Sequence, residues 1–156
     1  TVAEPLRAHL KLPRDLVATY RDAALKRVGL ASLPGDRTVS ELSAFDKRRL
    51  QVARAIVSAP LLAVIDEPLR GLDAFAQSVM RDLLRNLRAQ EGPAFIVITA
   101  DVAAANALCD DAMVLQAGQV IERGPLAELI RAPKEAYTRA LIEASLGSLS
   151  PAAPQG

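Results

Sequence analysis

Two short apolar segments, separated by a helical pattern, place the strongest constraint on the fold of this chain. Residues 61–65 read LLAVI and residues 94–99 read AFIVIT, and both predict buried strands. Between them, residues 74–91 predict a long helix with apolar side chains along one side. Buried strands that alternate with helices predict an α/β fold with a parallel sheet.

The segments before the first strand read as helices. Residues 1–30 predict a helical stretch, and a loop marked by Pro-Gly follows it. Residues 44–58 predict a second amphipathic helix, because Ser43 and Asp46 have the capping-box spacing at its start. We therefore expect a helical lobe over residues 1–58 that precedes the sheet.

The segments after the second strand predict a helix, a hairpin and two more helices. The hairpin joins AMVLQ to QVIER through Gly118, and the last helices cover residues 125–131 and 134–146. We assign residues 59–146 to the sheet-containing domain and expect residues 147–156 to be a disordered tail.

Composition excludes several classes of protein. Hydrophobic residues make up 51% and charged residues 24% of the 156 residues, as in a globular domain. A net charge of +1 and 3% aromatic residues argue against a nucleic-acid partner. Cys109 is the single cysteine, which excludes an internal disulfide and favours a reducing compartment.

Targeting and membrane-spanning segments are not visible in the sequence. No stretch reaches the ~18 apolar residues that a membrane-spanning helix needs, and no signal peptide is recognisable. The sequence begins with Thr1 instead of Met, so we expect a fragment or a processed product.

Two adjacent carboxylates follow the first predicted strand. Asp66 and Glu67 lie at its carboxyl end, where ligands bind in open α/β sheets. A carboxylate there suits Mg²⁺, usually through water, and a second one can orient or deprotonate a water molecule. The structural alternative is an acidic turn before a helix, with Asp66 as a helix cap.

The segment ELSAFDKRRLQVARAIVSAPLLAVIDEPLRGLD resembles the stretch from signature motif to D-loop in ATP-binding cassette (ABC) ATPases. FIVITAD and DDAMVLQAGQVIERGPLAELI are similar to the family's switch region and late hairpin. The resemblance implies a partial P-loop NTPase-like cassette that works with ATP and Mg²⁺. It implies that Asp66 holds Mg²⁺ through water and that Glu67 is the catalytic base. It also implies that Leu42 and Ser43 contact the nucleotide of a second subunit, and that Asp73 contacts that subunit in a homodimer or heterodimer.

The flanking segments TVAEPLRAHL and PKEAYTRALIEA resemble those of oligopeptide, dipeptide and nickel importers. This resemblance implies an ATPase subunit that powers peptide import from the cytoplasmic face of the membrane. The implied partners are transmembrane permease subunits, docked on residues 1–58, and indirectly a substrate-binding protein. The sequence does not identify the transported substrate.

Three departures from the family pattern predict a damaged ATP site. No glycine is followed by Lys, so the G-x-x-x-x-G-K-[ST] phosphate loop is absent. The signature L-S-G-G-Q is replaced by residues 42–46, LSAFD, so Ser43 and Asp46 can serve simply as a helix cap. Ala100 stands where the family has its switch histidine, while His9 reads as an ordinary surface or interface residue.

We therefore expect this chain alone to be inactive. The alternative function is a degenerate cassette that is a structural or regulatory partner of an active ATPase subunit.

Overall fold

The computed structural model of the chain contains two compact units, Thr1–Ile98 and Thr99–Gly156. The predicted domain boundary after residue 58 falls inside the first unit and stays a prediction. The predicted disordered tail lies outside the described residues, except Gly147, which ends a helix. The structure describes residues 2–10, 12–33, 38–90 and 92–147.

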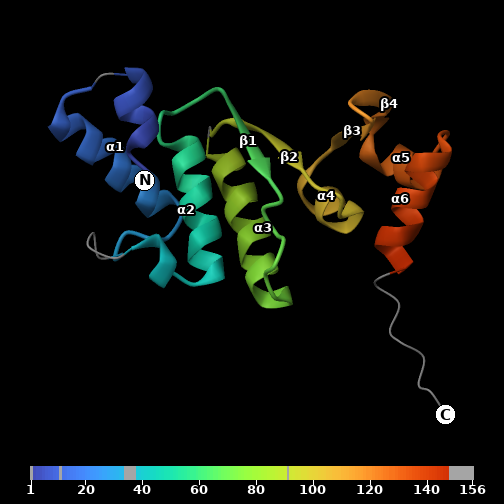
Figure 1. The fold of residues 1–156 in the computed structure, drawn as a ribbon, viewed down its shortest axis with the longest axis horizontal. Coiled ribbons are helices and arrows are strands. Elements are labelled where there is room, and N and C mark those ends of the chain that lie inside the picture. The colour runs from blue at the N-terminus through green and yellow to red at the C-terminus, as the bar shows by residue number, and fades with distance from the viewer. Residues whose placement is uncertain (1, 11, 34–37, 91, 148–156) are drawn as a thin grey trace, which may run out of the picture. The chain divides into compact units, whose positions relative to one another are not determined.

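The first unit begins with helices, as predicted, but they are interrupted (Figure 1). The elements are η1 (Leu6–Leu10, a π-helix), α1 (Arg14–Arg27), η2 (Val39–Glu41, a 3₁₀ helix) and α2 (Ala44–Ile56). The prediction of one helical stretch over residues 1–30 is therefore wrong around Pro13, which immediately precedes α1. Proline has no N–H to donate, and it disfavours helical backbone in the residue before it.

Helix α1 ends where the sequence predicts a stop. Gly29 has a φ of 74°, the left-handed conformation that glycine adopts without steric cost. The Leu30 N–H donates to the Leu25 carbonyl at 2.8 Å, and the Gly29 N–H donates to the Lys26 carbonyl at 3.1 Å. This pair of hydrogen bonds is a Schellman motif, which satisfies the last carbonyls of the helix and turns the chain away.

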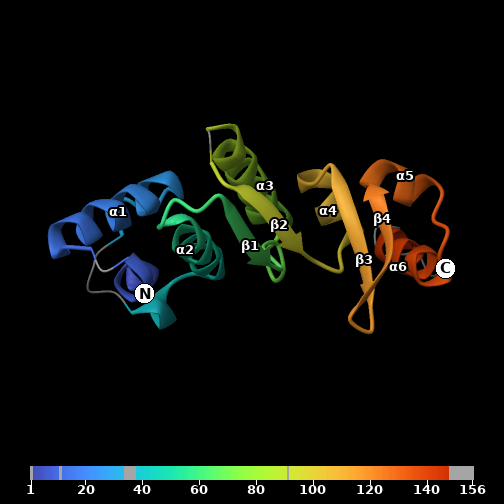
Figure 2. The ribbon, with the colours of Figure 1, turned by 90° about the horizontal axis from the view of Figure 1, so that it is seen from above.

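A two-stranded parallel sheet completes the first unit. Strand β1 (Leu62–Asp66), helix α3 (Ala74–Ala89) and strand β2 (Ala94–Ile98) form one β-α-β arrangement. The register pairs Leu62 with Ala94 and Asp66 with Ile98. Helix α2 contacts β1, and α3 runs along the sheet (Figures 1 and 2). The predicted parallel α/β fold is confirmed.

One face of this sheet is exposed, so the prediction that both strands are buried is wrong. Ala63 and Ile65 of β1 are buried, but their neighbours Leu62 and Val64 are 51% and 54% exposed. In β2, Ile96 and Ile98 are 41% and 51% exposed. Successive side chains of a strand point to opposite faces. Helices cover one of these faces, and no described element of residues 2–98 covers the other.

The second unit contains the predicted hairpin and helices (Figure 2). Its elements are α4 (Val102–Leu108), β3 (Asp111–Gln116), β4 (Gln119–Pro125), α5 (Leu126–Arg131) and α6 (Ala136–Gly147). Strands β3 and β4 are antiparallel, and both residues of their turn, Ala117 and Gly118, have positive φ. Positive φ at both central residues matches a type I′ turn, whose twist suits a two-residue hairpin.

A carboxylate of the hairpin holds the start of the last helix. Glu122 of β4 accepts hydrogen bonds from the backbone N–H groups of Lys134 at 3.0 Å and Glu135 at 3.2 Å. These residues immediately precede α6, so the carboxylate satisfies donors at the helix start. The Lys134 N–H is the main cause that lowers the pKa of Glu122 below its usual value.

Cys109 is the C-cap residue of helix α4. It follows the last residue of α4 in extended backbone conformation and is half-buried. Among the described residues, no helix combines the length and the apolar character needed to cross a lipid bilayer.

Candidate functional site

Asp66 and Glu67 lie at the carboxyl end of β1, as predicted. Asp66 is the last residue of the strand and is exposed, while Glu67 is half-buried and starts the following turn. The Glu67 N–H donates to the Ile98 carbonyl at 2.8 Å, which fixes the backbone of the turn against β2. Asp66 follows Leu62 and Val64 at two-residue spacing, so it shares the exposed face of the sheet.

Glu67 has an unusual backbone conformation. Its φ is 46°, in the left-handed region, which costs a residue with a side chain ~1–2 kcal/mol. Strained backbone of this kind concentrates at functional sites, where the surrounding structure holds it in place. The conformation therefore marks Glu67, and not only its carboxylate chemistry, as a candidate functional residue. Sequence spacing contains no indication of this strain.

The alternative in which Asp66 is a helix cap is wrong. The next helix is α3, and its cap is Asp73, whose Oδ1 accepts the Ala76 N–H at 2.8 Å. Asp73 therefore has the capping role that its position in the chain allows. Its proposed contact with a second subunit stays a prediction.

The residues of the predicted signature loop are held by their own helix. The Ser43 Oγ accepts the Asp46 N–H at 3.0 Å, and the Ser43 hydroxyl donates to Asp46 Oδ2 at 2.9 Å. Ser43 is thus the N-cap of α2, as the capping alternative predicted. Leu42 is 7% exposed and is therefore buried within the unit.

Arg49 makes further contacts at the start of α2 that were not predicted from the sequence. Its guanidinium lies 4.2 Å from the centre of the Phe45 ring and 3.5 Å from Asp46 Oδ1. It also donates to the Gly29 carbonyl at 3.2 Å, which joins α2 to the end of α1. The guanidinium therefore faces a ring, a carboxylate and a carbonyl of its own chain.

Ala100 belongs to the second unit and is exposed. Its neighbour Asp101 caps α4, with the Ala104 N–H donating to Asp101 Oδ1 at 3.0 Å. The Ser145 Oγ of α6 accepts the Val102 N–H at 2.9 Å, so α6 also contributes to the start of α4. Asp101 is therefore a helix cap, and the side chain of Ala100 carries no group that can exchange a proton.

The residues present meet part of what Mg²⁺ and a nucleotide require. Mg²⁺ is usually held by one or two carboxylates, with water and phosphate oxygens completing its shell, and the exposed Asp66 fits the first of these requirements. Within the described ranges, no group of three or more His, Cys, Asp or Glu side chains could hold a metal without such help. The phosphate-binding loop is absent from all 156 residues, so these residues cannot form a complete nucleotide site.

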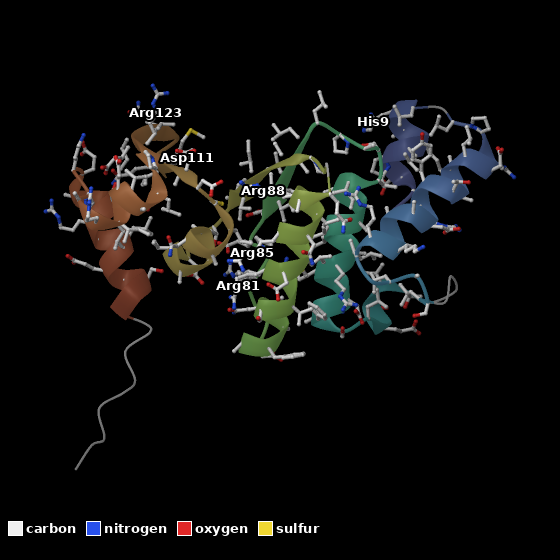
Figure 3. The ribbon with its side chains drawn as sticks, turned by 180° about the vertical axis from the view of Figure 1, so that it is seen from behind. His9, Arg81, Arg85, Arg88, Asp111 and Arg123 are labelled. Atoms are coloured by element: carbon white, nitrogen blue, oxygen red, sulfur yellow. The ribbon has the colours of Figure 1, made fainter. Side chains whose placement is uncertain are left out.

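Three arginines of α3 and the single histidine lie on elements other than these segments. Arg81, Arg85 and Arg88 line one side of α3, and Arg85 pairs with Asp82 at 3.7 Å, as on a solvated helix face (Figure 3). His9 is exposed on η1, which agrees with its prediction as a surface residue (Figure 3).

Comparison with known proteins places this arrangement in one class. No family model matches the chain. The solved structure of CbiO1 from Clostridium perfringens, part of an ABC transporter complex, has the same fold. Its TM-score is 0.69 and its sequence is 30% identical, over 95% of this chain and 57% of that one. The fold is therefore that of a partial ABC cassette, as predicted.

Curated relatives agree with the structural neighbour. The peptidoglycan transport ATP-binding protein YejF of Agrobacterium fabrum is 37% identical over 92% of this chain and 27% of its own length. The nickel import ATP-binding protein NikE of Rhodospirillum rubrum is 34% identical over 99% and 56%. The oligopeptide transport ATP-binding protein OppF of Escherichia coli is 34% identical over 92% and 43%. The chain spans about a quarter to just over half the length of these relatives, and its sequence is similar to the corresponding part of each.

Proposed function

We propose that the chain supplies the signature helix and the Walker B carboxylates of the ATP-binding subunit of an ABC importer. The observation that carries this proposal is the Asp66–Glu67 pair at the end of β1, with the Glu67 backbone fixed to Ile98. ATP hydrolysis by the complete subunit powers uptake across the cytoplasmic membrane. We propose a peptide as cargo, because relatives named for peptide transport are among those that match.

Each carboxylate has its own role in this proposal. Asp66 holds Mg²⁺ through water, and the metal neutralises charge on the phosphates when bound. Glu67 orients the attacking water and accepts its proton. Its half-buried position next to the exposed Asp66 suits this role. Leu42 and Ser43 meet the nucleotide of the second subunit, and Asp73 contacts that subunit.

A separate segment supplies the phosphate loop in this proposal. Leu62, Val64, Ile96 and Ile98 form an exposed apolar face of the sheet, and burial of such surface is favourable by ~25 cal/mol per Å². Asp66 lies at the end of the same face, so a segment that covers the face also lies next to the carboxylate that would hold Mg²⁺. The exposed face therefore supports an incoming element at this position.

The partners follow from the proposed class. A second ATPase subunit pairs with the complete subunit, and permease subunits dock on residues 1–58 at the cytoplasmic face of the membrane. A substrate-binding protein delivers the cargo on the other side. Crosslinking of co-expressed subunits should place permease contacts within residues 1–58, and contacts confined to residues 94–145 would exclude this docking mode.

A chimera with a relative tests the ATPase proposal. The segment of Rhodospirillum rubrum NikE that aligns with this chain would be replaced by this chain, and MgATP hydrolysis of the chimera measured. We expect hydrolysis above background, and we expect Glu67→Gln to lower it ~10²–10⁴-fold, the usual contribution of a general base. Asp101→Asn is the control, because it changes a different carboxylate, one that is exposed and caps α4. Equal rates with Glu67 and with glutamine would reject the role of Glu67.

The second candidate function is a degenerate cassette that supports an active partner. Two observations favour it: the closed Ser43–Asp46 network at α2 and the alanine at position 100. If these are defects, Ala100→His should raise turnover at the site of its own subunit. Changing Ala44 and Phe45 to Gly and Asp46 to Gln should raise turnover at the partner's site.

ATPase rates per site, with the other site silenced by a glutamate-to-glutamine change, measure these repairs. We expect each repair to raise its site at least ~10-fold, or ~1.4 kcal/mol in activation free energy. Unchanged rates after both repairs would show that these substitutions do not limit hydrolysis.

A further inference from the structure

Arg48 connects two candidate segments that lie 22 residues apart in the sequence. It lies in the second turn of α2, five residues after the cap Ser43. One guanidinium nitrogen donates to Gln51 Oε1 at 3.0 Å, and the other donates to the Arg70 carbonyl at 3.1 Å. The guanidinium is planar, so a hydrogen bond on one nitrogen orients the other. Gln51 therefore aims Arg48 at the turn that follows β1.

The Arg70 carbonyl lies in the middle of the turn that begins with Glu67 and ends with Asp73. The Arg70 N–H donates to the Glu67 carbonyl at 3.2 Å, and the next residue, Gly71, has a φ of 76°. The two ends of the turn have their own restraints, the Glu67 N–H on Ile98 and the Gln77 side-chain amide on the Leu72 carbonyl. Arg48 adds a restraint from α2 at the middle.

We propose that Arg48 is a positioning residue that couples the loop at the start of α2 to the backbone of Glu67. The proposal rests on the proposed function, in which residues 42–46 meet the nucleotide of a second subunit and Glu67 acts on the nucleotide of its own. A displacement of the start of α2 changes the geometry of the hydrogen bond from Arg48 to the Arg70 carbonyl. Because Glu67 is held in left-handed backbone, a small change in the turn changes the position of its carboxylate.

The neighbouring residue, Arg49, links the same part of α2 to helix α1. Arg49 faces the other way and donates to the Gly29 carbonyl at the end of α1, while it also pairs with Asp46. The first two turns of α2 are therefore attached to the end of α1 by Arg49 and to the turn of residues 67–73 by Arg48. Movement of α1 relative to the sheet is in this way transmitted to Glu67.

Nuclear magnetic resonance of the 156-residue chain tests the link without nucleotide. In Arg48→Ala, the amide resonance of Gly71 should shift, because its peptide group contains the Arg70 carbonyl that loses a hydrogen bond. Hydrogen exchange of the Arg70 amide should accelerate ~5-fold, as expected for one hydrogen bond. Arg54→Ala is the matched control, since Arg54 is on the same helix but pairs with Glu4 at 3.2 Å. An Arg48→Ala spectrum in which Gly71 does not move, or moves equally in Arg54→Ala, would overturn the proposal.

A second variant separates coupling from simple proximity. Ser43→Ala removes the cap of α2 and should shift the resonances of Gly71 and Glu67 in the parent chain. The same change made in Arg48→Ala should leave them in place, and Arg48→Lys should restore part of the effect, because lysine retains a charged donor. If Ser43→Ala still shifts the resonances of Gly71 and Glu67 in the Arg48→Ala chain, the proposal is overturned. These measurements need no ATP, so they are independent of the outcome of the chimera experiment.

Discussion

At the scale of single residues, Glu67 shows how the backbone conformation at a position and the chemistry of its side chain can favour different residues. Glu67 has a φ of 46°, a conformation that glycine adopts freely and that costs other residues ~1–2 kcal/mol. A residue chosen only for stability would be glycine. The proposed role of its side chain as a base gives a reason for a glutamate at this position.

Glu67→Gly should accordingly raise the free energy of unfolding of the chain, by up to ~1.5 kcal/mol. Relief of the left-handed strain provides ~1–2 kcal/mol, and the extra freedom of glycine in the unfolded chain offsets ~0.5–1 kcal/mol of it. Chemical denaturation followed by circular dichroism measures the difference. Glu67→Val should have the opposite sign, because a β-branched residue is least compatible with positive φ.

Ala117→Gly is the matched control for that prediction. Ala117 also has positive φ, at 49°, but it lies in the hairpin turn of the second unit, where no catalytic role is proposed. The same direction of change is expected there. If Glu67→Gly lowers the free energy of unfolding by more than ~1 kcal/mol and Ala117→Gly does not, contacts of the glutamate side chain outweigh the backbone strain.

At the scale of elements, α6 depends on a residue that lies outside it. The Glu122 carboxylate accepts the N–H groups of Lys134 and Glu135 immediately before the helix, and no side-chain cap is recognisable from local sequence spacing. A carboxylate at a helix start also interacts favourably with the helix dipole. The ordering of α6 is thus coupled to the hairpin.

Protonation of Glu122 should loosen the start of α6. The pKa of Glu122 is lowered in the folded state, first by the Lys134 N–H, so its contribution is present above the ordinary glutamate pKa of ~4.3. The contribution is lost as the pH falls through the lowered pKa. Hydrogen exchange of the first α6 amides should therefore accelerate in Glu122→Gln at neutral pH. Variant and parent should converge at acidic pH.

Glu143→Gln provides the control for this pH dependence, because it removes a carboxylate from an exposed position of α6 itself. It should leave exchange at the helix start unchanged at every pH. A Glu122→Gln variant that differs from the parent equally at neutral and acidic pH would show that the lost hydrogen-bond geometry, and not the charge, is what matters.

Elements with local signals were predictable from the sequence, and their surroundings were not. The parallel strand pair, the Ala117–Gly118 hairpin and the cap Ser43 follow from short patterns of apolar, glycine and hydroxyl residues. The burial of the strands was wrongly predicted, because an apolar run does not say whether a covering element is present. The hydrogen bonds from Arg48 to the Arg70 carbonyl and from Arg49 to the Gly29 carbonyl were missed, because they join residues 20 or more positions apart.

At the scale of the whole molecule, the chain carries the carboxylates proposed to serve Mg²⁺ and water, but it has no G-x-x-x-x-G-K-[ST] loop for phosphates. We expect that the chain alone binds MgATP too weakly for a micromolar dissociation constant and does not hydrolyse it. The backbone N–H groups of a phosphate loop would provide most of the phosphate contacts, and Asp46 already occupies the start of α2. Isothermal titration calorimetry with MgATP measures this, with the NikE chimera as the positive control. Micromolar binding by the chain alone would contradict the expectation.

The exposed apolar face of β1 and β2 also has a consequence for the behaviour of the chain in solution. Leu62, Val64, Ile96 and Ile98 lie on one side of two strands, and each strand has one edge without a partner among residues 2–98 that the structure describes. Strand edges of this kind are templates for pairing with other chains, and an adjacent apolar surface strengthens such pairing. Without a covering segment, the chain should therefore self-associate as its concentration rises. The concentration at which oligomers appear would then report directly on whether that face is covered.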